Sequence, residues 1–110
     1  MFLIVCLGAR REEKLKELVE SINSSGNGKA TFKVTDVTIR EHVVSLVQHA
    51  EKEFGKPLDC LINNAGVMPL SFIKNLHQDE WERMIDVNIK VCWDIQYFHV
   101  FCNYVNIYIE

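Results

Sequence analysis

The feature that most constrains this chain is an apolar segment that runs directly into two amides and a glycine, at Leu58 to Gly66. We expect Leu58 to Ile62 to form a short buried strand, which Asn63-Asn64-Ala65-Gly66 ends abruptly. In open α/β sheets, ligands bind outside the carboxyl ends of the strands, so this segment marks a candidate binding edge. Asn and Gly are also ordinary turn residues, and a strand-ending turn is the alternative interpretation.

Two further apolar segments precede this one, and amphipathic segments alternate with all three. Strands are predicted at Leu3 to Leu7 and Ala30 to Val34. Apolar residues at helical spacing predict the helices Glu12–Ser24, Thr38–Phe54 and Asp79–Lys90, with Thr38 and Glu41 spaced as a capping box. This alternation predicts an α/β fold, namely a partial Rossmann-like, doubly wound parallel sheet of three strands and three helices.

Composition and charge narrow the class of protein. The net charge is -3 over 110 residues, which gives no reason to expect nucleic-acid binding, and no segment is long and apolar enough to predict a membrane span. Four cysteines, Cys6, Cys60, Cys92 and Cys102, are widely spaced without a Cys-x-x-Cys pair, so neither a metal site nor a disulfide framework is predicted. Reduced thiols favour a cytoplasmic protein.

Three short motifs at matched spacing resemble the short-chain dehydrogenase/reductase family. Asn63-Asn64-Ala65-Gly66 follows a strand, Asp36-Val37 ends the strand before it, and Val87-Asn88 lies one helix later. The resemblance spans roughly Leu3 to Lys90, which it implies is a partial NAD(P)-binding Rossmann domain (residues 1–90). Residues 91–110 form a divergent, aromatic-rich tail, for which either a helix or a strand is possible.

The resemblance assigns roles to individual residues. It implies that Asp36 accepts a hydrogen bond from the adenine amino group, with the Val37 backbone beside it. Asn63, Ala65 and Gly66 would line the adenosine ribose. Alternatively, Asp36 caps the helix that follows it.

Asn88 corresponds in this resemblance to the catalytic asparagine, whose helix is locally distorted to hold a water of the proton relay. A buried and satisfied amide on an apolar helix face is the alternative for this residue.

Two arginines bear on the choice of cofactor. NAD-preferring members of the family have an acid just after the strand end, where this chain has Ala9, followed by Arg10 and Arg11. A guanidinium binds a phosphate bidentately, so the pattern favours NADP, with Arg10 on the 2′-phosphate and Arg11 assisting. Solvated charges at the start of a helix are the alternative.

Other parts of the family pattern are not found. The family's glycine-rich phosphate turn would precede Phe2, and its Tyr-x-x-x-Lys pair would follow Asn88, but no tyrosine after Asn88 (Tyr97, Tyr104, Tyr108) has a lysine four residues later. General acid catalysis requires such a proton donor, so we expect no turnover by this chain alone. We expect a truncated or alternatively spliced product or a misassembled gene model, three possibilities that the sequence does not separate.

Three functions are therefore open. The first is a fragment of an NADP-dependent oxidoreductase acting on a small carbonyl or alcohol substrate by hydride transfer. The second is a non-catalytic module that pairs with family members, or with a second copy, through the Asn88 helix. The third is an unrelated doubly wound binding domain.

Overall fold

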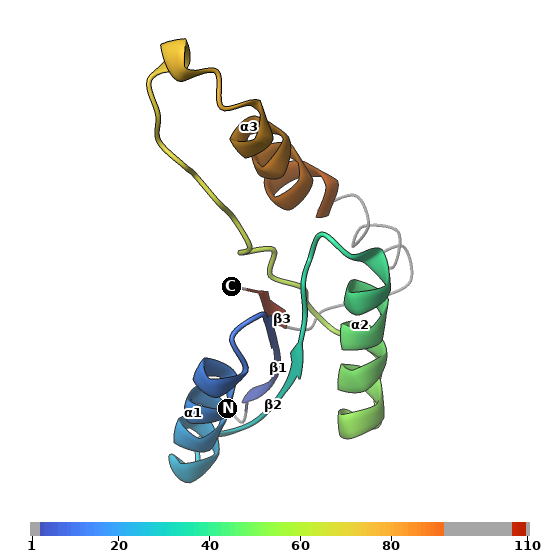
Figure 1. Cartoon of the computed structure of the whole chain (residues 1–110). Coiled ribbons are helices and arrows are strands. Elements are labelled where there is room, and N and C mark those ends of the chain that lie inside the picture. Colours follow the sequence, from blue (N-terminus) through green and yellow to red (C-terminus); the bar gives the residue numbers. More distant parts are fainter. Residues whose placement is uncertain (1–2, 92–106, 110) are drawn as a thin grey trace.

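The computed structural model of the chain describes residues 3–91 and 107–109. Figure 1 shows the elements in chain order, with the strands between helices α1 and α2. They are β1 (Leu3–Ala9), α1 (Glu12–Ser24), β2 (Gly28–Val34), α2 (Arg40–Phe54), the short 3₁₀ turn η1 (Ile73–Asn75), α3 (Gln78–Ile85), its π-helical continuation η2 (Asp86–Lys90) and β3 (Ile107–Ile109).

The described strands form one parallel sheet in the order β2-β1-β3. Residues Leu3 to Ala9 of β1 pair in register with Gly28 to Val34 of β2. The predicted parallel pairing of these two strands is confirmed, and each is two residues longer than expected. The fold is α/β and partly Rossmann-like, as the alternation of elements predicts.

The two faces of β1 are covered by different helices. Val5 and Leu7 pack with Leu15 of α1 and Ala30 of β2, whereas Cys6 belongs to the cluster that includes Val43 of α2. Successive side chains of a strand point to opposite faces, so a single apolar run supplies both layers. The continuous apolar pattern of β1 therefore reflects burial on two sides.

Two glycines govern how α2 packs and where it ends. A Cβ added to Gly8 would lie 2.4 Å from Cδ2 of Leu46, a side chain with 0% exposure. Gly8 thus allows α2 to approach β1 closely. Gly55 ends α2 in the left-handed conformation at φ 65°, and its N–H bonds the carbonyl of Glu51 at 2.8 Å. The predicted stop at this glycine is confirmed.

The predicted strand Leu58 to Ile62 is wrong in these bounds, because only Ile62 forms an isolated β-bridge. The edge of β1 opposite β2 pairs instead with β3, a piece of the tail for which helix and strand were both open. Leu58 is buried in the α2 cluster, and Leu61 and Ala65 pack against it. This apolar segment therefore packs against α2 and does not join the sheet as a strand. The prediction failed because an apolar run indicates burial but not which backbone it bonds.

The third helix follows its predicted range with one irregularity. It begins at Gln78, one residue early, and changes from α-helical to π-helical geometry at Asp86–Lys90. The predicted apolar side is only partly buried, because Val87 is buried while Ile85 is exposed. Single π-helical turns inside helices are found frequently at functional sites.

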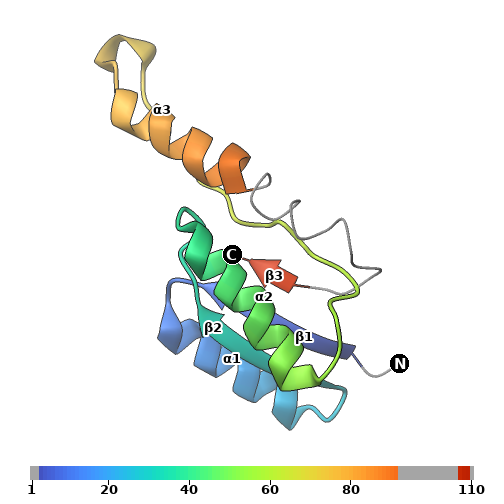
Figure 2. The same cartoon turned by 90° about the vertical axis from the view of Figure 1, so that its right-hand side faces the viewer.

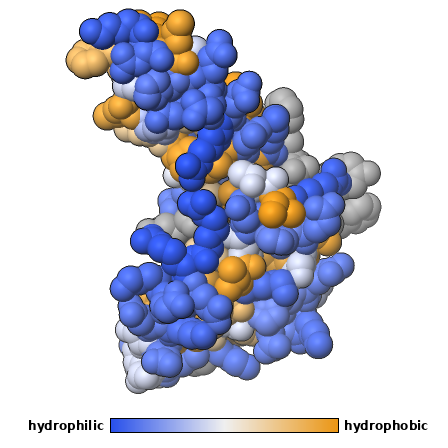
Figure 3. Space-filling model, in the orientation of Figure 1, coloured by the Kyte–Doolittle hydropathy of each residue, from blue (hydrophilic) through white to orange (hydrophobic). Residues whose placement is uncertain are grey.

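The segment before α3 extends away from the sheet, as Figure 2 shows. Its large apolar side chains are the most exposed in the described chain, and Figure 3 shows apolar surface gathered at this end of the molecule. They are Met68, Leu70, Phe72, Ile73 and Leu76. Among the helices that the structure describes, none combines the length and apolar character needed to cross a membrane.

Candidate functional site

The carboxyl ends of β1 and β2 lie side by side. Ala9 pairs with Val34, and the N–H of Thr35 donates to the carbonyl of Ala9 at 2.8 Å. Arg10 and Asp36, the residues just beyond these pairs, therefore project from the same edge of the sheet. This edge is where open α/β sheets bind ligands.

The carboxylate of Asp36 organises the turn that leads into α2. Its Oδ1 accepts hydrogen bonds from the Thr38 hydroxyl at 2.7 Å and the Thr38 N–H at 3.0 Å. These bonds lower the pKa of Asp36, the hydroxyl bond most, and the charge of Arg10 lowers it further. Asp36 is thus an ionised acceptor at neutral pH.

The predicted capping box at Thr38 is wrong. The helix begins at Arg40, its N-cap is Ile39, and no side chain caps it. Thr38 donates its hydroxyl back to Asp36, because a short side chain bonds a nearby carboxylate as readily as a helix N–H.

His42 completes the turn from the first turn of α2. Its Nδ1 accepts the N–H of Asp36 at 3.2 Å. Sequence reasoning missed His42, since a six-residue separation across an irregular turn gives no periodic signal.

Asn88 holds the loop after Gly66 against η2. Its Oδ1 accepts the N–H of Val67 and its Nδ2 donates to the carbonyl of Val67, both at 2.9 Å. Two bonds to one residue fix the loop in position and orientation. The helix at Asn88 is irregular, as the family resemblance implies, and its irregularity is the π-helical turn Asp86–Lys90.

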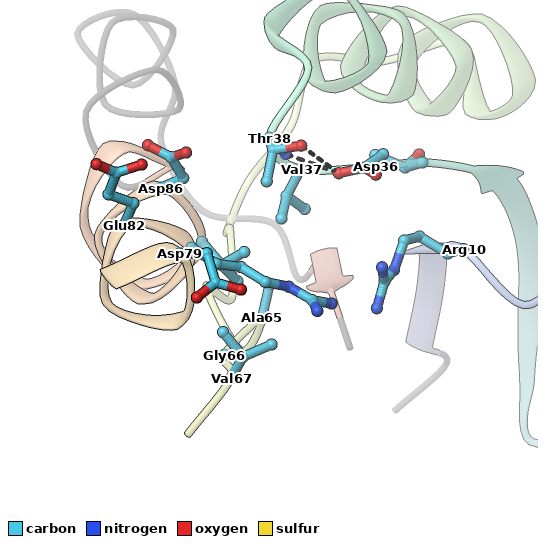
Figure 4. Close-up of a pocket in the computed structure, with 13 residues that line it drawn as sticks. Arg10, Asp36, Val37, Thr38, Ala65, Gly66, Val67, Asp79, Glu82 and Asp86 are labelled. Atoms are coloured by element: carbon cyan, nitrogen blue, oxygen red, sulfur yellow. Dashed lines mark hydrogen bonds between the residues drawn. The ribbon is translucent and has the colours of Figure 1, made fainter. Parts of the chain in front are cut away.

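These segments surround a cavity of about 390 Å³, within the size range of small-molecule sites. Figure 4 shows Arg10 on one side of it, Asp79, Glu82 and Asp86 on the other, and the other labelled residues between them. The cavity is lined by Arg10, Thr35, Asp36, Val37, Thr38, Ala65, Gly66, Val67, Asp79, Glu82, Arg83, Asp86 and Val87.

The cavity brings together five of the residues singled out in the sequence: Arg10, Asp36, Val37, Ala65 and Gly66. They come from three separate segments, the end of β1, the end of β2 and the loop before η1. Of these five residues, Arg10 carries a guanidinium and Asp36 a carboxylate, and the other three are small or apolar.

Three other candidates do not line this cavity. Arg11 is the exposed N-cap of α1, and Asn63 is exposed in the segment before the loop. Asn88 reaches the cavity indirectly, through its bonds to Val67.

One wall of the cavity was not foreseen. Asp79, Glu82, Arg83 and Asp86 all line it, and Lys90 pairs with Asp86 beyond it. Their spacing along α3 and η2 places them on one helix face, so a polar stripe in the sequence was the one sign of this wall. In the sequence this stripe is indistinguishable from a solvated face.

Among residues 3–91 and 107–109, no group of three His, Cys, Asp or Glu side chains could hold a metal ion. Tyr97 and Tyr104 lie outside the described residues, and Tyr108 is in β3.

The family model for short chain dehydrogenases matches residues 3–95, most of the chain. This chain therefore belongs to the short-chain dehydrogenase/reductase family. An uncharacterised oxidoreductase of Listeria innocua, Lin0452, is 50% identical over 84 residues, covering 76% of this chain but 33% of the relative. The chain spans about one third of the length of this relative and of two other similar uncharacterised oxidoreductases, from Staphylococcus saprophyticus and Listeria monocytogenes.

Solved structures of the family share the fold. A short chain dehydrogenase from Mycobacterium smegmatis superposes with a TM-score of 0.78 at 18% identity, over 89% of this chain and 51% of that one. An alcohol dehydrogenase from the archaeon Thermococcus sibiricus, complexed with 5-hydroxy-NADP, gives 0.77 at 17% identity, over 91% and 52%. At this identity, the likeness concerns the fold alone.

Proposed function

We propose that this chain is the adenosine-binding portion of an NADP-dependent oxidoreductase that interconverts a small carbonyl compound and its alcohol. Residues 1–90 would be the binding unit and residues 91–110 an appended tail. The observation that supports this most strongly is the cavity that unites Arg10, Asp36 and Gly66. In such an enzyme, the bound nicotinamide supplies or accepts the hydride.

The residues singled out in the sequence have chemistry that suits the contacts we propose. The ionised carboxylate of Asp36 accepts a hydrogen bond from the adenine amino group, beside the Val37 backbone. Ala65 and Gly66, with Asn63 before them, line the ribose, where small residues allow close backbone approach. Arg10, assisted by Arg11, binds the 2′-phosphate that distinguishes NADP from NAD.

The described residues offer fewer contacts for the rest of the dinucleotide. Among the described residues, Gly66 is the one glycine lining the cavity, so no glycine-rich turn borders it to hold a pyrophosphate. Asn88 is proposed as the residue of the catalytic relay, but an amide supplies no proton. We therefore propose weak cofactor binding and no turnover by this chain alone.

Binding of nucleotide fragments tests the cofactor proposal. In a protein-observed NMR titration, the chain should bind 2′,5′-ADP more tightly than 5′-AMP. Arg10→Asp should weaken the binding of 2′,5′-ADP by about tenfold or more, since hydrogen bonds between charged groups are lost. The affinity for 5′-AMP should change little.

Arg11→Asp is the matched control, because it makes the same change of charge outside the cavity. Its effect should be the smaller of the two. Equal affinity of the unaltered chain for the two nucleotides would contradict a 2′-phosphate site.

Pairing with a second copy or a family member is the second candidate function, and it could accompany the first. Ile85 and Ile89 of the Asn88 helix are each 47% exposed and lie one turn apart. Sedimentation equilibrium should show a dimer that Ile89→Lys dissociates. A monomer at all concentrations would exclude this interface.

A cytoplasmic site of action is part of the proposal. Cys6 and Cys60 carry free thiols, which suit a reducing compartment. Cell fractionation with a tagged chain checks this, and recovery in a secreted fraction would contradict it.

A further inference from the structure

Arg83 lines the cavity from α3. It precedes Val87 by four residues, so the two lie on one helix face, one turn apart. Val87 is buried in the same cluster as Val37, and the two bonds between Asn88 and Val67 hold this helix against the cavity floor. The helix that carries Arg83 is therefore held in place beside the cavity.

The guanidinium of Arg83 is not engaged elsewhere in the described chain. Asp79 lies four residues before it, a spacing at which helical ion pairs form, but no ion pair joins them. Arg10 likewise has no ion pair among residues 3–91 and 107–109. Two guanidinium groups from different elements thus line one cavity and remain available to a ligand.

The surrounding charges differ at the two arginines. Asp79, Glu82 and Asp86 line the cavity from the same helix as Arg83. Within residues 3–91 and 107–109, only Asp86 of these three pairs with a lysine, Lys90. A phosphate placed against this wall would be repelled by the remaining carboxylates. A neutral purine would not be repelled by these carboxylates. The planar guanidinium of an arginine readily stacks on an aromatic ring.

We propose that Arg83 covers the face of the nucleotide base, closing the cavity from the α3 side, while the phosphate goes to Arg10. Arg83 is then a determinant of affinity for the adenine ring and not for the 2′-phosphate. This inference rests on the proposed nucleotide function and assigns a cofactor contact to α3, which the motifs of the sequence do not include.

The test compares two ligands that share the base and differ in the 2′-phosphate. The whole chain is titrated with 5′-AMP and with 2′,5′-ADP, followed by protein-observed NMR. Arg83→Ala should lower the affinity for both ligands by the same factor, about threefold to tenfold, which is the range of a stacking interaction. Arg83→Lys should lower the affinity almost as much, because lysine keeps the positive charge but lacks the planar guanidinium that stacks on the base.

Arg40→Ala is the control, since Arg40 is exposed at the start of α2 and does not line the cavity. Unshifted amide signals of α1 and β2 in each variant confirm that the fold is retained. A loss confined to 2′,5′-ADP would overturn the inference, because it would place the phosphate at Arg83. Full rescue by Arg83→Lys would overturn it too, since charge alone would then suffice.

Binding that responds to Arg10→Asp but not to Arg83→Ala would refute this inference and leave the proposed function standing. Failure of the unaltered chain to bind either nucleotide would refute both.

Discussion

Asp36 has two roles at the scale of single residues. It shapes the turn into α2 through both bonds from Thr38, and it remains a carboxylate at the rim of the cavity. These bonds shape the turn without capping α2, whose N-cap is Ile39, so the alternative in which Asp36 caps the helix is wrong. Hydrogen bonds from one side leave lone pairs of the carboxylate for another donor.

The pKa of Asp36 should lie below its ordinary value of 3.8 and should rise when the Thr38 hydroxyl is removed. Because the folded pKa is lowered, Asp36 stabilises the fold above the unfolded value, and this contribution is lost as the pH falls through the folded pKa. In Thr38→Val, we expect the pKa to move toward 3.8 without reaching it, since the Thr38 N–H and Arg10 remain.

A carboxyl-carbon NMR titration measures this pKa. Thr31→Val is the matched control, because the Thr31 hydroxyl contacts His49 and not Asp36. The same Asp36 pKa in Thr38→Val and in the unaltered chain would show that the hydroxyl bond is not its main cause.

Asparagines join separate elements in the same way at two places. Asn88 bonds both polar groups of the Val67 backbone, and Asn23 of α1 does the same to Ala30 of the edge strand β2, at 2.7 and 3.2 Å. A primary amide has a donor and an acceptor and can replace a missing strand neighbour. Asn88 positions the loop that lines the cavity, and Asn23 ties a helix to its strand.

Asn88→Ala should release the loop at Val67. Loss of two hydrogen bonds predicts a destabilisation of about 1–2 kcal/mol and faster exchange of the Val67 amide. Asn23→Ala is a matched control at the other site and should speed exchange at Ala30 instead. Hydrogen exchange followed by NMR reports both amides, and unchanged exchange at Val67 in Asn88→Ala would contradict the assigned role.

The described part of the molecule is elongated. Its radius of gyration is 15.5 Å, against about 13 Å for a compact domain of this length. The difference reflects the segment at Met68 to Leu76 and α3, which extend in Figure 1 from the body formed by the sheet, α1 and α2. Exposed apolar patches of this kind add nothing to a fold's own stability.

The same substitution should therefore change stability by very different amounts at two leucines. Leu46→Ala, at 0% exposure against β1, should lower the free energy of unfolding by about 2–5 kcal/mol. Leu70→Ala, at 85% exposure, should change it by no more than about 0.5 kcal/mol. Urea unfolding measures both, and a comparable loss in Leu70→Ala would mean that the extended segment packs in solution.

The sequence by itself determined the elements whose signals are local. The bounds of α1 follow from apolar spacing, Gly55 ends α2 as predicted, and β1 and β2 follow from their apolar runs. The motifs also selected Arg10 and Asp36 at the carboxyl ends of these strands, because position along a strand decides which edge a residue faces.

Only the tertiary structure decided the features that depend on partners distant in the chain. Pairing of β1 with β3 in place of Leu58 to Ile62, the bond of His42 to Asp36, and the placement of Arg83 over the cavity are of this kind. Apolar periodicity reports how much of a segment is buried, and it does not report which segment satisfies the free backbone groups or which charges meet across a cavity.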